Sequence, residues 1–423
     1  MQNNNTPYEK IHVLQEGIPA YEALERISKE LEKDGLPNYD LGSYTAIEMP
    51  AEAKLLIQLT LGKNMINKNE YSQTTIIHER LVKIIGNLLH VPDENDICGS
   101  STTGSSEAIF MALLAAKWRW KQNGNQGDPN LVLCSNAHIS WHKSARFLDI
   151  QVREVPLHIV NEYPIEAVRA SIDENTIGVV AVLGCTYVGF CDPIVQINEM
   201  LEAVNTQYGW DVGIHVDAAI GGFVYPFVAH LQKVRWDFRL PLVKSINLSG
   251  HKYGLVYPGL GWLLFRDQNC FPEELKTTAE YLYGVSKSFT VSFSRSSSLI
   301  IAQQFCFLHY GMNGYKNIIE NCLWNAEILT EAIQKCNFLQ LVSESTLPIV
   351  AFKFTEEPSF PLVIYTELLR KRKWMLPYYK LSGELEDTVM RIVIRKDMTL
   401  EMIFRLVEDL EECYKIVKNE YTT

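Results

Sequence analysis

Apolar and polar positions follow a helical period in the first part of the chain. Residues 21–33 and 79–91 carry apolar side chains at every third or fourth position, which predicts two amphipathic helices. Residues 41–44 and 64–67 lack this period and are expected to form loops. The polar residues 1–18 predict a loose arm.

The pattern changes between residues 99 and 270, where short apolar runs alternate with amphipathic segments. The apolar runs are predicted strands at 131–135, 151–155, 177–184, 213–219, 244–249 and 261–265. The segments between them are predicted helices at 105–120, 139–148, 164–172 and 194–207. Apolar strands that alternate with helices favour an α/β fold with a mainly parallel sheet covered on both faces.

The last part of the chain predicts a smaller α+β unit. It follows a helical segment near 297–336 and has strands at 347–354 and 389–395 and helices at 361–373 and 399–419. We therefore expect a helical N-terminal segment, a large domain and a small C-terminal domain, at residues 1–95, 96–317 and 318–423.

Composition narrows the class of protein. With 423 residues, of which 47% are hydrophobic, the chain can bury a large core. A net charge of −11 without a basic stripe argues against nucleic acid or an anionic membrane as partner. No apolar run reaches the roughly 18 residues of a membrane span, and the polar start does not resemble a signal peptide. Nine cysteines without a Cys-x-x-Cys pair indicate reduced thiols in a cytoplasm, and neither disulfides nor a metal site.

Residues 245–254, SINLSGHKYG, place a lysine just after an apolar strand. Burying the ammonium group of Lys252 there would be costly, because it loses its water. A lysine that forms an imine with a carbonyl cofactor is the exception, since a dry site and a lowered pKa favour its neutral amine. A surface lysine that merely follows a strand would give the same pattern.

Two further segments carry candidate chemistry. Residues 99–108, GSSTTGSSEA, open a predicted helix with glycines and hydroxyls, so free N–H groups with Ser105 and Ser106 could bind an anion. An ordinary serine-rich helix cap is the alternative. Asp217 lies near the end of the apolar run GIHVDAA. A carboxylate is costly to bury there unless it faces a cation, so we favour a cation-binding role. An aspartate that merely caps a turn is the alternative. Ligands of such sheets bind at the carboxyl ends of the strands, where we expect both Asp217 and Lys252.

A lysine for an aldehyde, an acid for a ring nitrogen and a serine-rich helix start for a phosphate together suit pyridoxal 5'-phosphate (PLP). The segments GSSTTGSSEA, HVDAAIGGF, SINLSGHKYG, LGWLLFRD and FTVSFSR resemble the PLP-dependent group II amino-acid decarboxylases, most closely the glutamate decarboxylases. The resemblance runs from about Pro19 to about Tyr414. It implies the aspartate aminotransferase-like fold (fold type I), PLP as cofactor, and decarboxylation of L-glutamate to 4-aminobutanoate.

The resemblance also assigns residues around the PLP ring. Lys252 matches the lysine that binds PLP, and Asp217 the acid that keeps the pyridine nitrogen protonated. Ala219 is expected under the ring, and Thr186 near its oxygen. His138 occupies the position of the stacking ring, where bacterial glutamate decarboxylases often carry glutamine.

Five residues match the group that holds the phosphate: Ser105, Ser106, Ser249, His251 and Ser294. In the family the last of these comes from the neighbouring subunit. The resemblance therefore implies a homodimer, or a higher homo-oligomer, whose active sites are shared between subunits.

The resemblance also assigns residues that act on the substrate. Tyr281 corresponds to the tyrosine that protonates the product carbon, although Tyr283 is only two residues away. Arg391 matches the arginine that takes a substrate carboxylate, but a structural ion pair is the alternative.

The distal carboxylate is held in glutamate decarboxylases by a threonine, an asparagine and an aspartate. Their positions read Ser43, Asn64 and Asn67 here. Because an amide donates at any pH, Asn67 could adapt glutamate binding to neutral pH, or mark another acidic or polar substrate.

Two other functions are compatible with parts of the pattern. One is a PLP-dependent carbon–carbon lyase of phosphorylated long-chain amines, whose lysine also lies in an HKYG-like turn. The other is an inactive paralogue that serves as a partner subunit. The latter predicts loss of Lys252 or Asp217, and both residues are present.

Overall fold

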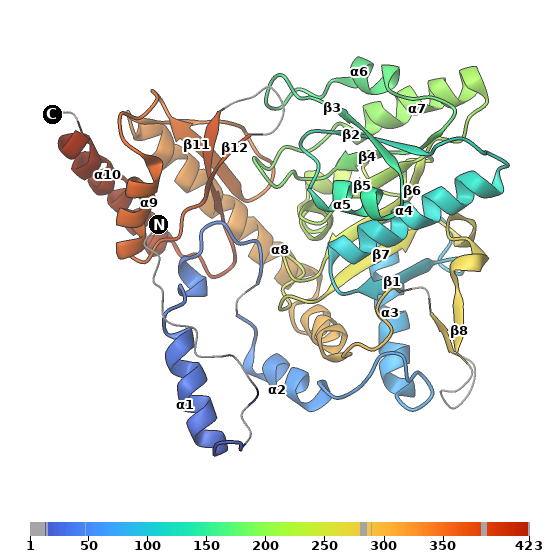
Figure 1. The fold of residues 1–423 in the computed structure, drawn as a ribbon, viewed down its shortest axis with the longest axis horizontal. Helices are drawn as coiled ribbons and strands as arrows, with labels where there is room; N and C mark the ends of the chain where they lie inside the picture. The colour runs from blue at the N-terminus through green and yellow to red at the C-terminus, as the bar shows by residue number, and fades with distance from the viewer. Residues whose placement is uncertain are drawn as a thin grey trace.

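Two β-sheets and a long helix organise the molecule (Figure 1). The computed structural model describes residues 13, 16–46, 48–279, 286–288, 290–381 and 387–421. Helix α8 (Ser298–Lys335) runs from the seven-stranded sheet to the four-stranded one. A ribbon of two short strands, β8 (Thr277–Ala279) and β9 (Ser286–Ser288), lies apart from both sheets.

The large sheet has the strand order β1-β7-β6-β5-β4-β2-β3. Its strands are β1 (Cys98–Thr102), β2 (Asn130–Cys134), β3 (Gln151–Val155), β4 (Thr176–Val182), β5 (Ile214–Asp217), β6 (Val243–Ser249) and β7 (Gly261–Phe265). Five neighbouring strands of the sheet pair in parallel, in the order β6-β5-β4-β2-β3. Strand β7 is antiparallel to both β6 and β1. The prediction of a mainly parallel sheet is therefore confirmed. Strand β1 was not predicted, because its sequence CGSST has no apolar period.

Helices cover both faces of this sheet. They are α4 (Ser105–Gln122), α5 (Ser140–Phe147), α6 (Ile165–Ala170) and α7 (Ile194–Tyr208), close to their predicted bounds. Strand β4 is buried along its whole length, as expected for a central strand with a helix layer on each side. One apolar cluster includes Val179 and Val216, and a second includes Val180 and Trp141, so alternate residues of β4 enter different cores.

The four-stranded sheet is antiparallel, in the order β10-β11-β13-β12. Its strands are β10 (Leu339–Leu341), β11 (Ile349–Phe354), β12 (Tyr378–Lys380) and β13 (Thr388–Val393). Helices α9 (Leu362–Lys371) and α10 (Leu400–Tyr421) share one apolar cluster with this sheet and with the second half of α8. Strands and helices therefore form the α+β unit that the pattern predicts.

The N-terminal segment contributes three helices, α1 (Ala20–Leu31), α2 (Ala51–Thr60) and α3 (Ser72–Leu88). Helix α1 has no buried residue, and its apolar side chains Leu24, Ile27 and Leu31 are exposed. Helix α2 was not predicted, and α3 begins seven residues earlier than the pattern at 79–91 indicates. The residues of α2, AEAKLLIQLT, are mostly apolar but do not gather on one face, since Leu55 and Leu59 are exposed. The first turn of α3, SQTT, is polar.

Each of the nine cysteines, all within the described residues, is a free thiol. Among the helices that the structure describes, none has both the length and the apolar composition needed to cross a membrane.

Candidate active site

A cavity of about 310 Å³ opens at the carboxyl ends of three central strands. Val182 ends β4, Asp217 ends β5 and Ser249 ends β6, and all three line the cavity together with Lys252. Because parallel strands end at the same edge of a sheet, segments distant in sequence supply this lining. The structure therefore brings the predicted lysine and the predicted acid into one cavity.

Lys252 lies in the turn that follows β6 and is half-buried. Its Nζ lies 4.9 Å from the centroid of the Tyr44 ring. Burial lowers the pKa of the Lys252 amine to about 8; the Asp217 carboxylate opposes this change and the Arg391 guanidinium adds to it. A larger fraction of neutral amine follows, and the neutral amine is the form that attacks a carbonyl carbon.

Asp217 is buried and accepts three hydrogen bonds from N–H groups. Its Oδ2 accepts from Trp141 Nε1 at 2.9 Å. Its Oδ1 accepts from Asn247 Nδ2 at 2.9 Å and from the backbone N of Ala219 at 3.2 Å. These donors fix the position of both carboxylate oxygens. A cationic group in the cavity would complete this environment.

The start of α4 forms the serine-rich end of the cavity. Gly104 caps the helix with a φ of +156°, and its carbonyl accepts from the N–H of Ala108. The Oγ of Ser105 lies 2.8 Å from the Oγ of Ser249, so hydroxyls from α4 and β6 meet there. Helix N–H groups beside two hydroxyls make a suitable site for an anion such as a phosphate.

His138 lies between this end and the wall formed by α5. Its Nδ1 accepts from the backbone N of Ser140 at 3.2 Å and lies 2.8 Å from Ser140 Oγ. The Oγ of Ser106 lies 2.8 Å from the same hydroxyl, which links Ser106 to the His138 side of the cavity. Burial lowers the pKa of the His138 imidazole, and the Asp217 carboxylate partly opposes this.

His251 also lines the cavity and donates from Nδ1 to the carbonyl of Leu260 at 2.9 Å. Burial, followed by the Lys252 ammonium, lowers the pKa of the His251 ring. Its Nε2 is therefore the nitrogen that remains for a ligand. Thr186 and Ala219 complete the predicted lining residues found here.

Arg391 reaches towards the lysine from β13 of the small sheet. Its Nη1 donates to the carbonyl of Thr186, and its Nη2 donates to the carbonyl of Gly42 at 2.8 Å. The guanidinium carbon lies 4.7 Å from the Tyr44 ring centroid, and the Tyr44 hydroxyl donates to the Thr186 carbonyl at 2.8 Å. Within the described residues, the buried Nε has no hydrogen-bond partner.

Ser43 precedes Tyr44, and its Oγ lies 2.8 Å from Thr45 Oγ1. Neither Ser43 nor Arg391 belongs to the described lining of the cavity, although both adjoin Tyr44. Tyr44 therefore joins Lys252 to the predicted substrate residues on the small-sheet side.

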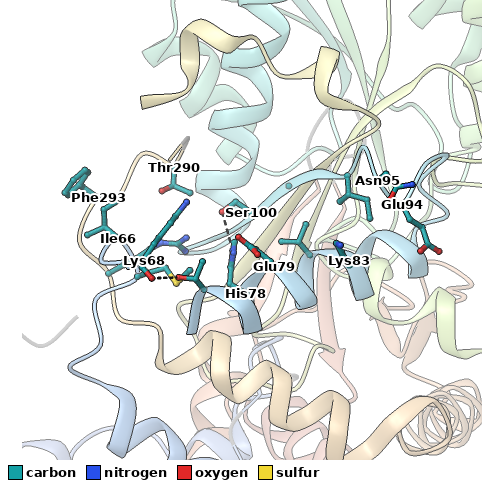
Figure 2. A pocket seen from close by; sticks show the side chains of 16 residues that line it. Ile66, Lys68, His78, Glu79, Lys83, Glu94, Asn95, Ser100, Thr290 and Phe293 are labelled. Carbon is teal, nitrogen blue, oxygen red and sulfur yellow. Dashed lines mark hydrogen bonds between the residues drawn. The ribbon is translucent and has the colours of Figure 1, made fainter. Parts of the chain in front are cut away.

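Three predicted residues lie together at a different place. Asn64 Nδ2 donates to Ser294 Oγ at 3.2 Å, and Asn67 Nδ2 donates to Glu70 Oε2 at 3.1 Å. None of Asn64, Asn67 and Ser294 is among the described residues that line the Lys252 cavity. Their chain neighbours instead line a second cavity of about 370 Å³ between α3, β1 and residues 290–295, where Figure 2 labels Ile66, Lys68 and Phe293.

Tyr281 and Tyr283, the two candidates for the proton donor, lie outside the described residues.

Four residues of the site were missed by the pattern analysis: Tyr44, Trp141, His215 and Asn247. His215 Nε2 lies 2.7 Å from Asn247 Oδ1, and Asn247 in turn donates to Asp217. Polar residues at alternate positions of otherwise apolar strands were an available signal for His215 and Asn247. Tyr44 carried no comparable signal, because its partners are far away in the sequence.

The donor set suits the groups of PLP. The cavity offers an amine for the aldehyde, a buried carboxylate for the pyridine nitrogen, and hydroxyls at a helix start for the phosphate. Among the described residues, no three His, Cys, Asp or Glu side chains gather as a metal site would require.

Comparison with known proteins agrees with this chemistry. Residues 32–355 match the model of the pyridoxal-dependent decarboxylase conserved domain. The chain is 39% identical to glutamate decarboxylase of Solanum lycopersicum over 418 residues, which cover 96% of this chain and 82% of that protein. It is 38% identical to glutamate decarboxylase of Lactococcus lactis subsp. cremoris over 415 residues, covering 95% and 89%.

A solved structure of Lactobacillus brevis glutamate decarboxylase superimposes with a TM-score of 0.91 at 34% identity, covering 96% of this chain and 94% of that one. The agreement extends over both sheets, so the predicted fold type is confirmed together with the dependence on PLP. This chain belongs to the pyridoxal-dependent decarboxylase family.

Proposed function

We propose that this protein is a PLP-dependent carboxy-lyase that converts L-glutamate to 4-aminobutanoate and carbon dioxide. The observation that carries the proposal is the shared cavity of Lys252 and Asp217, which Tyr44 connects to Arg391. The glutamate decarboxylases that resemble the chain over almost its whole length support the choice of substrate.

PLP supplies a ring that accepts the electron pair left behind when the carboxylate departs. Lys252 would hold the aldehyde of PLP through its neutral amine. Asp217 would face the ring nitrogen and favour its protonated form, which strengthens electron withdrawal. His138 and Ala219 would hold the ring between them, and Thr186 would add a hydroxyl to the same lining.

The phosphate is held by the start of α4. Ser105 and Ser249 donate hydroxyls from positions 2.8 Å apart, and Ser106 and His251 add further donors. Tyr281 is proposed as the acid that protonates the product carbon.

We propose that Arg391 and Ser43 bind the substrate carboxylates from the small-sheet side. The unpartnered Nε of Arg391 and the second hydrogens of its Nη groups are the donors available to a carboxylate.

A homodimer is part of the proposal. Asn64, Asn67 and Ser294 would serve the cavity of a second subunit, since none of them is among the described lining residues of their own. The N-terminal segment 1–95, with its exposed apolar face on α1, is proposed to contribute to the contact. The free thiols support a cytoplasmic location.

The test compares kcat/KM for glutamate, aspartate, glutamine and phenylalanine. Glutamate should exceed glutamine and phenylalanine by about 10³-fold, because a site built for two carboxylates leaves buried donors unpaired when one is absent. Aspartate keeps both carboxylates but at a shorter spacing, and glutamate should be the better substrate of the two. The variant Lys252→Ala should show no turnover and provides the blank.

A better rate with another amino acid would disprove the glutamate assignment without affecting the decarboxylase assignment. The variant Asn67→Asp then separates the two interpretations of that position. Adaptation to neutral pH predicts retained glutamate activity with an optimum at lower pH, because a carboxyl must be protonated to donate.

A further inference from the structure

Asp217 belongs to a row of buried polar side chains on one face of the large sheet. Strands β5 and β6 are parallel, and their register pairs His215 with Ser245 and Asp217 with Asn247. Because side chains alternate between the two faces along a strand, these four residues share a face. All four are buried, although the residues between them on the two strands, Val216 and Ile246, are apolar. We call this set the polar ladder.

The hydrogen bonds of the polar ladder have a single direction. Asn247 Nδ2 donates to Asp217 Oδ1 at 2.9 Å, which places Asn247 Oδ1 at 2.7 Å from His215 Nε2. An amide oxygen only accepts, so His215 Nε2 carries the hydrogen and Nδ1 accepts. Ser245 Oγ, 2.7 Å from His215 Nδ1, is the donor to that nitrogen.

The Asp217 carboxylate determines the orientation of the Asn247 amide. Reversing the amide would place its oxygen against that carboxylate. This contact would be repulsive in a buried place where water cannot compensate it. Burial lowers the pKa of the His215 ring, which agrees with a neutral imidazole that donates from only one nitrogen.

Trp141 holds the carboxylate from the other side. Its Nε1 donates to Asp217 Oδ2 at 2.9 Å, while its ring meets the His215 ring edge-on with centroids 4.8 Å apart. Both oxygens of Asp217 are therefore tied to side chains that are themselves packed, and the plane of the carboxylate is determined.

We propose that His215 and Asn247 are positioning residues, which hold Asp217 in the orientation that meets the pyridine nitrogen of PLP. The inference rests on the proposed function, in which Asp217 binds that nitrogen. Charged groups must be held within roughly 0.5 Å and 10–20° of their productive geometry to act fully. The Asn247 amide has no proton to pass on, so the polar ladder orients Asp217 without protonating it.

Four variants test this role. His215→Phe keeps the ring volume without a donor, and Asn247→Leu removes the amide at similar size. His215→Gln retains an amide N–H that can donate to Asn247 Oδ1 and serves as the rescue. Thr176→Val is the matched control, because it removes another buried hydrogen bond, which joins Thr176 Oγ1 to Asn130 Oδ1 at 2.8 Å. Thr176 begins β4 and therefore lies at the end of the strand that is away from the cavity.

PLP affinity of the apoprotein is measured by quenching of tryptophan fluorescence. His215→Phe and Asn247→Leu should each weaken it by about 10–100-fold, by analogy with residues that orient the ligands of a metal ion. The turnover number kcat should fall by a similar factor with little change in KM. His215→Gln should recover most of both losses, and Thr176→Val should show neither.

A second measurement does not depend on activity. The ¹⁵N chemical shift of labelled pyridine nitrogen in the loaded protein should report full protonation in the wild type and in His215→Gln. It should report partial loss of that proton in His215→Phe and Asn247→Leu. Should Asn247→Leu fail to fold, the two His215 variants alone decide the comparison.

Two results would overturn the inference, and they are distinguishable. If His215→Phe and Asn247→Leu bind PLP like Thr176→Val while Asp217→Ala binds weakly, the polar ladder has only a structural role. If Asp217→Ala itself binds PLP and turns over like the wild type, the proposed role of Asp217 fails, and the inference fails with it.

Discussion

The Tyr44 ring lies close to two cationic side chains, Lys252 and Arg391, at 4.9 and 4.7 Å from its centroid. An aromatic face attracts cations, so Tyr44 offsets part of the repulsion between them. Burial nevertheless remains the main reason why the pKa of Lys252 is lowered to about 8. The site therefore prepares the nucleophilic amine before any ligand enters.

This lowered pKa predicts the pH dependence of PLP uptake by the apoprotein. A group whose pKa falls on folding loses its proton earlier, so the neutral amine should become half-populated near pH 8. The rate of covalent uptake, followed by absorbance, should rise with pH around this value. Free lysine, with a pKa of about 10.4, provides the comparison.

Arg391→Gln supplies a second check of the same argument. Removing a nearby cation makes the Lys252 ammonium less unfavourable, so the midpoint of uptake should move to higher pH. An unchanged midpoint in this variant would contradict the contribution of Arg391.

Among the elements, α8 packs against both sheets and has one interruption in its helical backbone. Gly311 has φ 56° and ψ −171°, a conformation that only glycine adopts readily. Ile300 and Cys306 before it and Tyr315 and Ile319 after it pack in the core of the large sheet, whereas Leu329 and Ile333 pack against the small sheet. The kink at Gly311 thus bends the helix while both of its flanks stay in the large core, and the change of core comes further along the helix.

Gly311→Ala should destabilise the protein by about 1–3 kcal/mol, the cost of a side chain in this backbone region. No atom lies within 4 Å of the position of the added Cβ, so the loss would come from backbone strain rather than from a clash. Urea unfolding followed by circular dichroism measures it. Gly62→Ala, also in open space but without a positive φ, is the control, and an equal loss in both would refute the explanation.

At the scale of the whole molecule, the predicted site residues fall into two groups. Lys252 and Asp217 share one cavity, whereas Asn64 and Ser294 contact each other beside a second cavity. In a dimer with two-fold symmetry, Asn64 and Ser294 of each subunit could reach the cavity that holds Lys252 and Asp217 of the other subunit.

Mixed dimers test this arrangement. Lys252→Ala and Asn64→Ala should each be nearly inactive alone. Equal mixing and reassembly should restore about a quarter of wild-type activity, since half of the dimers are mixed and each has one intact site. Lys252→Ala mixed with Asp217→Ala is the control and should restore nothing, because both residues serve the same subunit. No recovery in the first mixture would contradict shared sites.

Much of the fold and part of the site could be predicted because they depend on local pattern. Apolar runs separated by amphipathic segments indicate buried strands between helices, and strand ends locate Asp217 and Lys252. The short strand β1 and helix α2 were not predicted, because their sequences do not show such a local pattern. Strand β1 is polar, and it becomes a strand only because β7 offers a complete antiparallel partner.

The sequence by itself determined which residues are apolar, where strands end and which side chains bear the chemistry. Only the tertiary structure decided which of them meet. His215 contacts Asn247 because β5 and β6 pair in one register, and a shift by one residue would separate them. Arg391 reaches Gly42 and Thr186 because the loops that hold these two residues pack against the small sheet, and no local pattern records a contact across hundreds of residues.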